Sequence, residues 1–145
     1  MTKAIFKILA TLAAGCAAVP LAAQSAPPRP ASPFSPIVRA GALYFLSGQI
    51  ATDPATATFD PALTIEAQTK QIWANIAATL RREGMTLDHV KQAQVYLTDM
   101  ADYDRMNAAY VAAIGTARPA RTTVQVVALP RGARIEVAVI AAKAD

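Results

Sequence analysis

Apolar side chains recur at helical spacing in two separate stretches of the chain. The first stretch has one face made of Ile65, Thr69, Ile72, Ile76 and Leu80. Steps of three and four residues place these side chains on one side of an amphipathic helix, for which Thr64 is a suitable N-cap. Residues 103–114 repeat the pattern behind an aspartate cap, either Asp99 or Asp102, and end before a glycine.

The segments around these two predicted helices follow the patterns of β-strands. From Val90 to Thr98 apolar and polar side chains alternate, which is typical of a strand with one buried face. The other expected strands are residues 37–40, 43–46, 121–129 and 134–142. A Pro130-Arg131-Gly132 turn signal separates the last two, which would join them as an antiparallel hairpin.

The element order is therefore β-β-α-β-α-β-β, which predicts one α+β domain. Two helices can cover only one face of a sheet this wide, so we expect a sandwich with both helices on that face. The other face then presents apolar residues without a helical cover. Because such a face usually becomes an interface, we expect a closed homo-oligomer.

Residues 1–23 have the layout of a secretory signal peptide. Two lysines form a basic start, residues 8–18 are uncharged and mainly apolar, and Pro20 precedes small residues. The apolar run is short for a bilayer span. We expect cleavage after Ala23, with Ser25 as the alternative position. The alternative interpretation is an uncleaved N-terminal anchor.

Cys16 raises a second alternative for the same segment. The run Leu12-Ala13-Ala14-Gly15-Cys16 resembles a bacterial lipobox, in which the cysteine is lipidated, but Ala13 stands where leucine is usual. We prefer an unmodified cysteine; both interpretations predict export, and signal cleavage predicts a periplasmic or secreted protein without a membrane contact. Residues 24–36 hold five of the ten prolines, which predicts an extended linker before a domain at residues 37–145.

Composition narrows the function classes. The 145 residues, 54% of them hydrophobic, suffice for one domain and are too few for two full cores. One cysteine and one histidine exclude an intramolecular disulfide, a cysteine-rich zinc site and a histidine triad, so we expect no metal. Removal of residues 1–23 would leave 12 of the 14 basic residues and all 10 acidic ones, a charge of +2 in place of +4. This net positive charge is too small to indicate a nucleic-acid-binding protein.

Two charged residues near the predicted C-terminal strands are candidates for chemistry. Glu136 lies in the otherwise apolar run 135–140, where a carboxylate needs a partner, a hydrogen bond or a proton. Arg121 opens the preceding strand. If the last two strands form a hairpin, the two residues need not be directly paired, but they can still reach one pocket, within one subunit or across an interface. The plainer alternatives are an edge-strand carboxylate facing water and a surface cation.

Other polar side chains are weaker candidates. Asn107 lies beside the apolar stripe of the second helix, where it is either buried and hydrogen-bonded or solvated. Ser47 and Gly48 end a strand, where a hydroxyl and a backbone N–H either face a ligand or form a turn. His89 has no serine or cysteine partner and is interpreted as a surface residue. Trp73 is interpreted as a packing residue.

Five runs of residues occur together in one order along the chain. They are Ser47-Gly48-Gln49-Ile50, Val95-Tyr96-Leu97-Thr98-Asp99-Met100, Asn107-Ala108-Ala109-Tyr110, Arg118-Pro119-Ala120-Arg121-Thr122-Thr123-Val124 and Leu129-Pro130-Arg131-Gly132-Ala133-Arg134-Ile135-Glu136-Val137. In order and spacing they closely resemble the RidA (YjgF) family of reactive intermediate deaminases. The resemblance extends from about Pro33 to Ala142.

The resemblance implies a chorismate-mutase-like fold with a mixed sheet, and a homotrimer with sites at its subunit interfaces. It also implies hydrolysis of 2-imino acids, or their enamine tautomers, to 2-keto acids and ammonia without a cofactor. By match to the family, Arg121 binds the substrate carboxylate and Glu136 positions the attacking water. Ser47, Gly48 and Asn107 match positions of the substrate pocket.

Two pocket positions depart from the family pattern and bear on substrate preference. Phe34 stands where many members have tyrosine, and Thr123 stands where many have cysteine.

An exported copy would act on imino acids released outside the cytoplasm, for instance by amino-acid oxidases. The competing hypothesis is a non-enzymatic protein that binds small carboxylates in the same intersubunit pocket. RNA cleavage, which is also attached to this family by name, gains little support from a charge of +2.

Overall fold

The computed structural model describes residues 33–144 of the chain. The expected signal peptide, its two cleavage positions, Cys16 and residues 24–32 of the expected linker lie outside the described residues. In the part of the chain that is described, no helix has the length and apolar character that a bilayer crossing requires.

Both predicted helices are present. Helix α1 spans Ile65–Arg82, and the Thr64 hydroxyl accepts the backbone N–H of Ala67 at 3.3 Å, so the expected N-cap is confirmed. Helix α2 spans Tyr103–Ile114. Of the two aspartates proposed as its cap, Asp102 occupies the cap position without a capping hydrogen bond, whereas Asp99 caps the short 3-10 turn before it.

Five strands form one mixed sheet in the order β1-β2-β5-β3-β4. They are β1 Ile37–Ala40, β2 Leu43–Gln49, β3 Val90–Leu97, β4 Ala120–Gln125 and β5 Ile135–Ala142. Strands β3 and β4 are parallel, with α2 as their crossover, and all other neighbours are antiparallel. The expected hairpin of the last two strands is therefore wrong, because β3 lies between them.

Strand β4 is also shorter than the expected strand over residues 121–129. After Gln125 the chain leaves the sheet, and Val127 is completely exposed. The apolar run that suggested a longer strand therefore belongs partly to the connection toward β5. This connection crosses β3 and so cannot be the tight turn that a hairpin would need.

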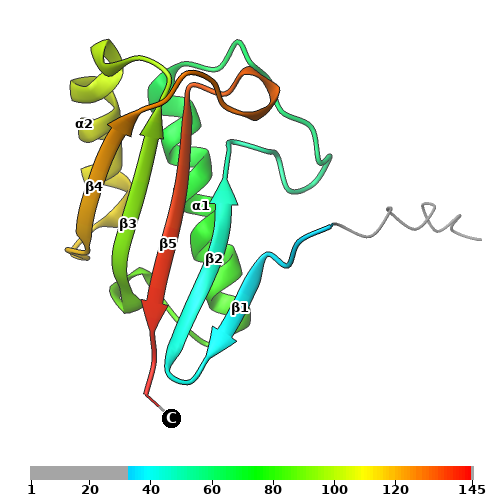
Figure 1. The fold of residues 1–145 in the computed structure, drawn as a ribbon, viewed down its shortest axis with the longest axis vertical. Coiled ribbons are helices and arrows are strands. Elements are labelled where there is room, and N and C mark those ends of the chain that lie inside the picture. Colours follow the sequence, from blue (N-terminus) through cyan, green and yellow to red (C-terminus); the bar gives the residue numbers. More distant parts are fainter. Residues whose placement is uncertain (1–32, 145) are drawn as a thin grey trace, which may run out of the picture. The chain divides into compact units, whose positions relative to one another are not determined.

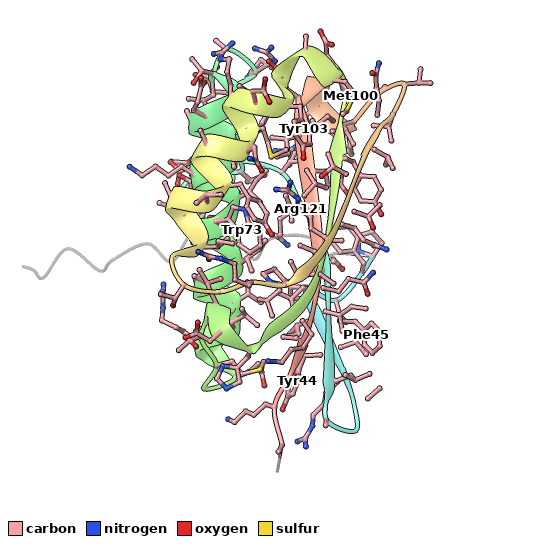
Figure 2. All side chains as sticks on the ribbon, turned by 90° about the vertical axis from the view of Figure 1, so that its left-hand side faces the viewer. Tyr44, Phe45, Trp73, Met100, Tyr103 and Arg121 are labelled. Carbon is pink, nitrogen blue, oxygen red and sulfur yellow. The ribbon has the colours of Figure 1, made fainter. Side chains whose placement is uncertain are left out.

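The two helices cover one face of the sheet, as Figure 1 shows. The largest fully buried side chains between the layers include Trp73, Ile72, Ile76, Leu97 and Ile135. On the opposite face Phe45 points away from the helices (Figure 2), and its side chain is 41% exposed. Val38, Leu43 and Val124 are exposed as well. The sandwich with one uncovered apolar sheet face is thus confirmed.

Candidate functional site

Arg121 lies on β4 between the sheet and the helix layer (Figure 2). Its Nη1 donates to Oδ1 of Asn107 at 2.8 Å, and its Nη2 donates to the hydroxyl of Tyr103 at 3.0 Å. The guanidinium carbon also lies 4.6 Å from the centre of the Tyr110 ring. Three side chains of α2 at helical spacing therefore fix the position of this guanidinium.

The Arg121 guanidinium keeps donors for a ligand. It has five N–H groups and no acceptor, and the two contacts to α2 use two of them. Within residues 33–144 it forms no ion pair, and its Nε has no hydrogen-bond partner. Nε and one N–H on each of Nη1 and Nη2 therefore remain as donors, and a guanidinium binds a carboxylate with two parallel hydrogen bonds.

A cavity of about 270 Å³ opens beside Arg121, between α2 and the start of β4. Its lining residues are Asn107, Tyr110, Val111, Ile114, Arg118, Pro119 and Arg121. The lining combines two cations and an amide with apolar walls and contains no carboxylate. A small organic anion with an apolar portion suits this chemistry. A larger groove between α1 and α2 shares none of these residues and is lined mainly by alanines.

Glu136 lies on β5, which runs between β2 and β3, so the alternative of an edge-strand carboxylate is wrong. The side chain is half-buried, and burial raises the pKa of its carboxyl above the ordinary value. Gly48 lies against it, since a β-carbon on residue 48 would overlap the carboxylate, with the Glu136 Cδ only 2.8 Å away. A register shift between Leu46 and Gln49 brings Gly48 into this position.

Ser47 connects this region with the segment before β1. Its hydroxyl donates to the carbonyl of Ser35 at 2.7 Å, and its backbone N–H donates to the carbonyl of Pro36 at 3.1 Å. Ser47 is therefore fixed by hydrogen bonds to residues 35 and 36, and it does not form the local turn that was the alternative interpretation. These bonds hold the 35–36 segment beside β2, and Phe34 precedes it with 64% of its surface exposed.

Arg121 and Glu136 project from opposite faces of the sheet. Paired residues on neighbouring strands share a face, and the face alternates along each strand. Val95 of β3 pairs both with Thr123 of β4 and with Val137 of β5. Arg121, two residues before Thr123, therefore shares the helix-covered face with Val137, and Glu136 lies on the uncovered face. Of the two expected arrangements, a pocket within one subunit is excluded.

A partly buried ion pair connects the elements that hold the two side chains. Asp102, next to the start of α2, is 3% exposed, and Nη2 of Arg134 lies 2.6 Å from its carboxylate oxygens. Arg134 immediately precedes β5. The pair therefore fixes the beginning of the helix that holds Arg121 against the beginning of the strand that holds Glu136.

The remaining sequence candidates are placed as follows. The Thr123 hydroxyl is buried on the same face as Arg121, has no partner among residues 33–144 and does not line the cavity. His89 accepts the backbone N–H of Thr86, so it has a capping role. Trp73 packs edge-on against Tyr110, with ring centres 5.0 Å apart, so its interpretation as a packing residue is confirmed.

Sequence reasoning missed Tyr103 and Tyr110 as partners of Arg121. Both belong to the apolar stripe of α2, and the stripe alone assigns them to the core. The signal that could have found them is their spacing around Asn107. Residues 103, 107 and 110 occupy one side of a helix, so a partner of the asparagine also meets the two rings.

Comparisons with known proteins agree with this fold. The family model described as Endoribonuclease L-PSP matches residues 24–143. A RutC family protein of Pyrococcus horikoshii is 40% identical over 116 residues, which cover 80% of this chain and 91% of that protein. The mouse 2-iminobutanoate/2-iminopropanoate deaminase is 33% identical over 114 residues, which cover 79% and 84%. The crystal structure of RidA from an Antarctic Psychrobacter has a TM-score of 0.72 and 34% identity, covering 80% of this chain and 93% of that one.

Proposed function

Because the chain belongs to the endoribonuclease L-PSP family, which includes RidA and RutC proteins and a mouse imine deaminase, we propose that it hydrolyses 2-imino acids. The products are 2-keto acids and ammonia. The observation that supports this function best is the Arg121 half-site, which offers a fixed guanidinium edge beside a cavity with apolar walls. It suits the carboxylate and the side chain of such a substrate.

Arg121 orients the substrate through its carboxylate. Bidentate binding fixes the plane of the carboxylate and thereby the position of the adjacent imine carbon. Asn107 contributes its amide, since its Oδ1 is occupied by Arg121 and its N–H groups remain donors. We expect Thr123, which is buried on the same face as Arg121, and Phe34, which precedes the segment bonded to Ser47, to influence which side chains are accepted.

Glu136 positions the water and moves its protons. Water adds to the imine carbon, the C=N electron pair passes to nitrogen, and the carboxylate takes a water proton. The carboxyl gives this proton to the nitrogen, which forms a carbinolamine. Glu136 then relays the hydroxyl proton to the same nitrogen, the C–N bond breaks, and ammonia leaves as the hydroxyl oxygen becomes a carbonyl. A carboxyl whose pKa is raised by burial suits both the uptake and the return of this proton.

The complete site requires two copies of the chain. Arg121 and Glu136 face opposite sides of the sheet, so one copy presents the carboxylate-binding half and a neighbour presents Glu136, Gly48, Ser47 and Phe34. An interface between unlike surfaces closes into a ring when the rotation permits it. We propose the homotrimer, in which the uncovered sheet face around Phe45 is buried as the sites are completed.

The decisive experiment follows keto-acid release from imino acids that an amino-acid oxidase generates in the assay. Wild-type protein should raise the rate above the uncatalysed background for at least one of several aliphatic side chains. Arg121→Ala should abolish turnover and binding of 2-oxobutanoate, whereas Glu136→Gln should abolish turnover and keep binding. Glu83→Gln, an exposed glutamate at the end of α1, is the control for the charge change.

A wild-type protein that binds 2-oxobutanoate without any turnover would instead support the non-enzymatic carboxylate-binding alternative. Single-stranded RNA should be included as a substrate, because the description of the matching family names an endoribonuclease. The formal charge of +2 without residues 1–23 offers little electrostatic attraction for a polyanion, so we expect no cleavage.

We also propose that the protein acts after export, on imino acids released outside the cytoplasm. The support is the basic start, apolar run and small-residue flank of residues 1–23. Cell fractionation with N-terminal sequencing of the product tests this. A mature chain that begins at residue 24 or 26 in the periplasm or medium is expected, and an intact cytoplasmic chain would contradict the proposal.

A further inference from the structure

We propose that Arg118 binds a second carboxylate of the substrate, so that the site prefers 2-imino dicarboxylic acids to imino acids with aliphatic side chains. This inference rests on the proposed function, because it names the substrate class of the same site. Arg118 and Arg121 line one cavity, and the described residues that line it with them include no carboxylate. The two cations repel each other, and a dianion offsets this repulsion more fully than a monoanion.

Hydrogen bonds to the end of α2 hold the Arg118 side chain beside the cavity. Its Nη1 donates to the carbonyl of Gly115 at 2.8 Å and to the carbonyl of Ala117 at 2.7 Å. Carbonyls at the end of a helix lack partners within the helix, and a cation is favourable there. The two bonds restrict a long side chain that would otherwise sample many rotamers in water. Arg118 is therefore exposed to a ligand and still held in place.

Arg118 keeps donors for a ligand, as Arg121 does. A guanidinium has five N–H groups, and Nη1 uses its own on the two carbonyls. Nε and Nη2 have no hydrogen-bond partner among residues 33–144, and Arg118 forms no ion pair in that range. The contacts that cap the helix thus leave Nε and Nη2 available, and a guanidinium binds a carboxylate with two parallel hydrogen bonds.

The short chain between the two arginines limits the length of the ligand. Extended chain spans at most about 3.5 Å per residue, so the α-carbons of Arg118 and Arg121 lie within about 10 Å of each other. Apolar side chains of Val111, Ile114 and Pro119 line the same cavity. A short dicarboxylic acid has matching chemistry, with charged ends for the two guanidinium groups and methylene groups for the apolar wall. An imino acid with the side chain of glutamate fits this pattern.

The test compares 2-oxopentanedioate with 2-oxopentanoate, which share a carbon chain and differ only in the second carboxylate. Calorimetry on the wild type should give a Kd about tenfold lower for the dicarboxylate, as expected for one charge-assisted contact. Arg118→Gln should reduce this ratio to about one, because an amide lacks both the charge and the planar fork. In the deamination assay, kcat/KM for the imino acids of glutamate and norvaline should show the same preference and the same loss.

The ratio of the two ligands separates binding from folding, because a purely structural role of Arg118 would weaken both ligands equally. Arg81→Gln is the matched control, since it removes an exposed arginine from the last turn of α1, outside the cavity. If Arg118→Gln does not fold, Arg118→Lys decides, because it keeps a cation at the end of α2 without the planar fork. A fall in its ratio supports the proposal, and an unchanged ratio overturns it.

The other outcomes are equally decisive. A dicarboxylate preference that Arg118→Gln removes and Arg81→Gln keeps supports the proposal. A wild-type ratio near one overturns it, even where aliphatic imino acids are hydrolysed and the deaminase function stands. A preference that Arg118→Gln retains, or that both variants lose, overturns it as well. If the wild type prefers the dicarboxylate but has no turnover, the deaminase function fails and the role of Arg118 stands. If it binds neither ligand, the proposal fails.

Discussion

Mixed oligomers of two inactive variants, Arg121→Ala and Glu136→Gln, should regain deaminase activity. Each variant loses one half of every site. Because the two side chains lie on opposite faces of the sheet, each site of the proposed oligomer should take its arginine from one copy and its glutamate from a neighbour. In a mixed oligomer some interfaces join an intact Arg121 to an intact Glu136, and those sites are complete.

The size of the recovery follows from random assembly. In an equal mixture, about half of the copies have an intact Arg121 and about half have an intact Glu136, so about one site in four is complete in a closed ring with unlike interface surfaces. We therefore expect about a quarter of the wild-type kcat per site, with an unchanged KM. A site within one subunit would give no recovery.

The assay is keto-acid release after the two variants are unfolded together and refolded, or co-expressed with different tags. Tandem purification on both tags establishes that mixed oligomers have formed, and in mixed trimers selected in this way about one site in three should be complete. Wild type mixed with the double variant is a quantitative control, since about a quarter of the sites are complete when sites lie between copies and about half when they lie within one. Mixed oligomers without activity would refute the two-copy site.

Three further results are expected. Gly48→Ala should lower kcat at least tenfold with little change in Tm, because the added β-carbon displaces the Glu136 carboxylate; unchanged kinetics would contradict this contact. Activity should rise with pH as Glu136 loses its proton, with a midpoint above its ordinary pKa of 4.5 because burial raises it, and a midpoint below 4.5 would contradict the role of the base. The hydrogen bond from Arg105 is the main cause that lowers the pKa of the Glu66 carboxyl to about 2, so this group should titrate near that value by NMR. The Glu66–Arg105 pair stabilises the folded state fully above pH 4.5, and this contribution is lost as the pH falls toward 2. Glu66→Gln should remove this acid dependence of the folding stability.

The helices and the sandwich were predictable from the sequence because the responsible signals are local. The stripe ending at Leu80 and the Thr64 cap need only a few neighbouring residues, and the structure has α1 where they place it. The strand order was not predictable in the same way. Residues 130–132 signal a turn, but a turn does not determine which strands pair, and β3 takes the place between β4 and β5.

The candidate site shows the same difference between local signals, which the sequence contains, and non-local ones. The isolated charge of Glu136 in an apolar run indicated a special residue, and its place on the central strand β5 explains why burial affects it. The partners of Arg121 were not accessible, because Tyr103 and Tyr110 are indistinguishable from core residues by periodicity alone. Their role depends on the parallel pairing of β3 and β4, which brings Arg121 under α2. That pairing is non-local.

The opposite orientation of Arg121 and Glu136 makes assembly a condition for chemistry in the proposed enzyme. A single copy has an anion-binding half that faces α2 and a carboxylate half on the uncovered face, and neither can complete the other. Burial of exposed Phe45, Leu43 and Val124 provides a driving force for association, at roughly 25 cal/mol per Å² of apolar surface. The same step would withdraw Glu136 further from water and raise its pKa more, since a neighbour then covers the half-buried carboxyl. Dilution below the dissociation constant of the oligomer should therefore remove activity without unfolding the subunit.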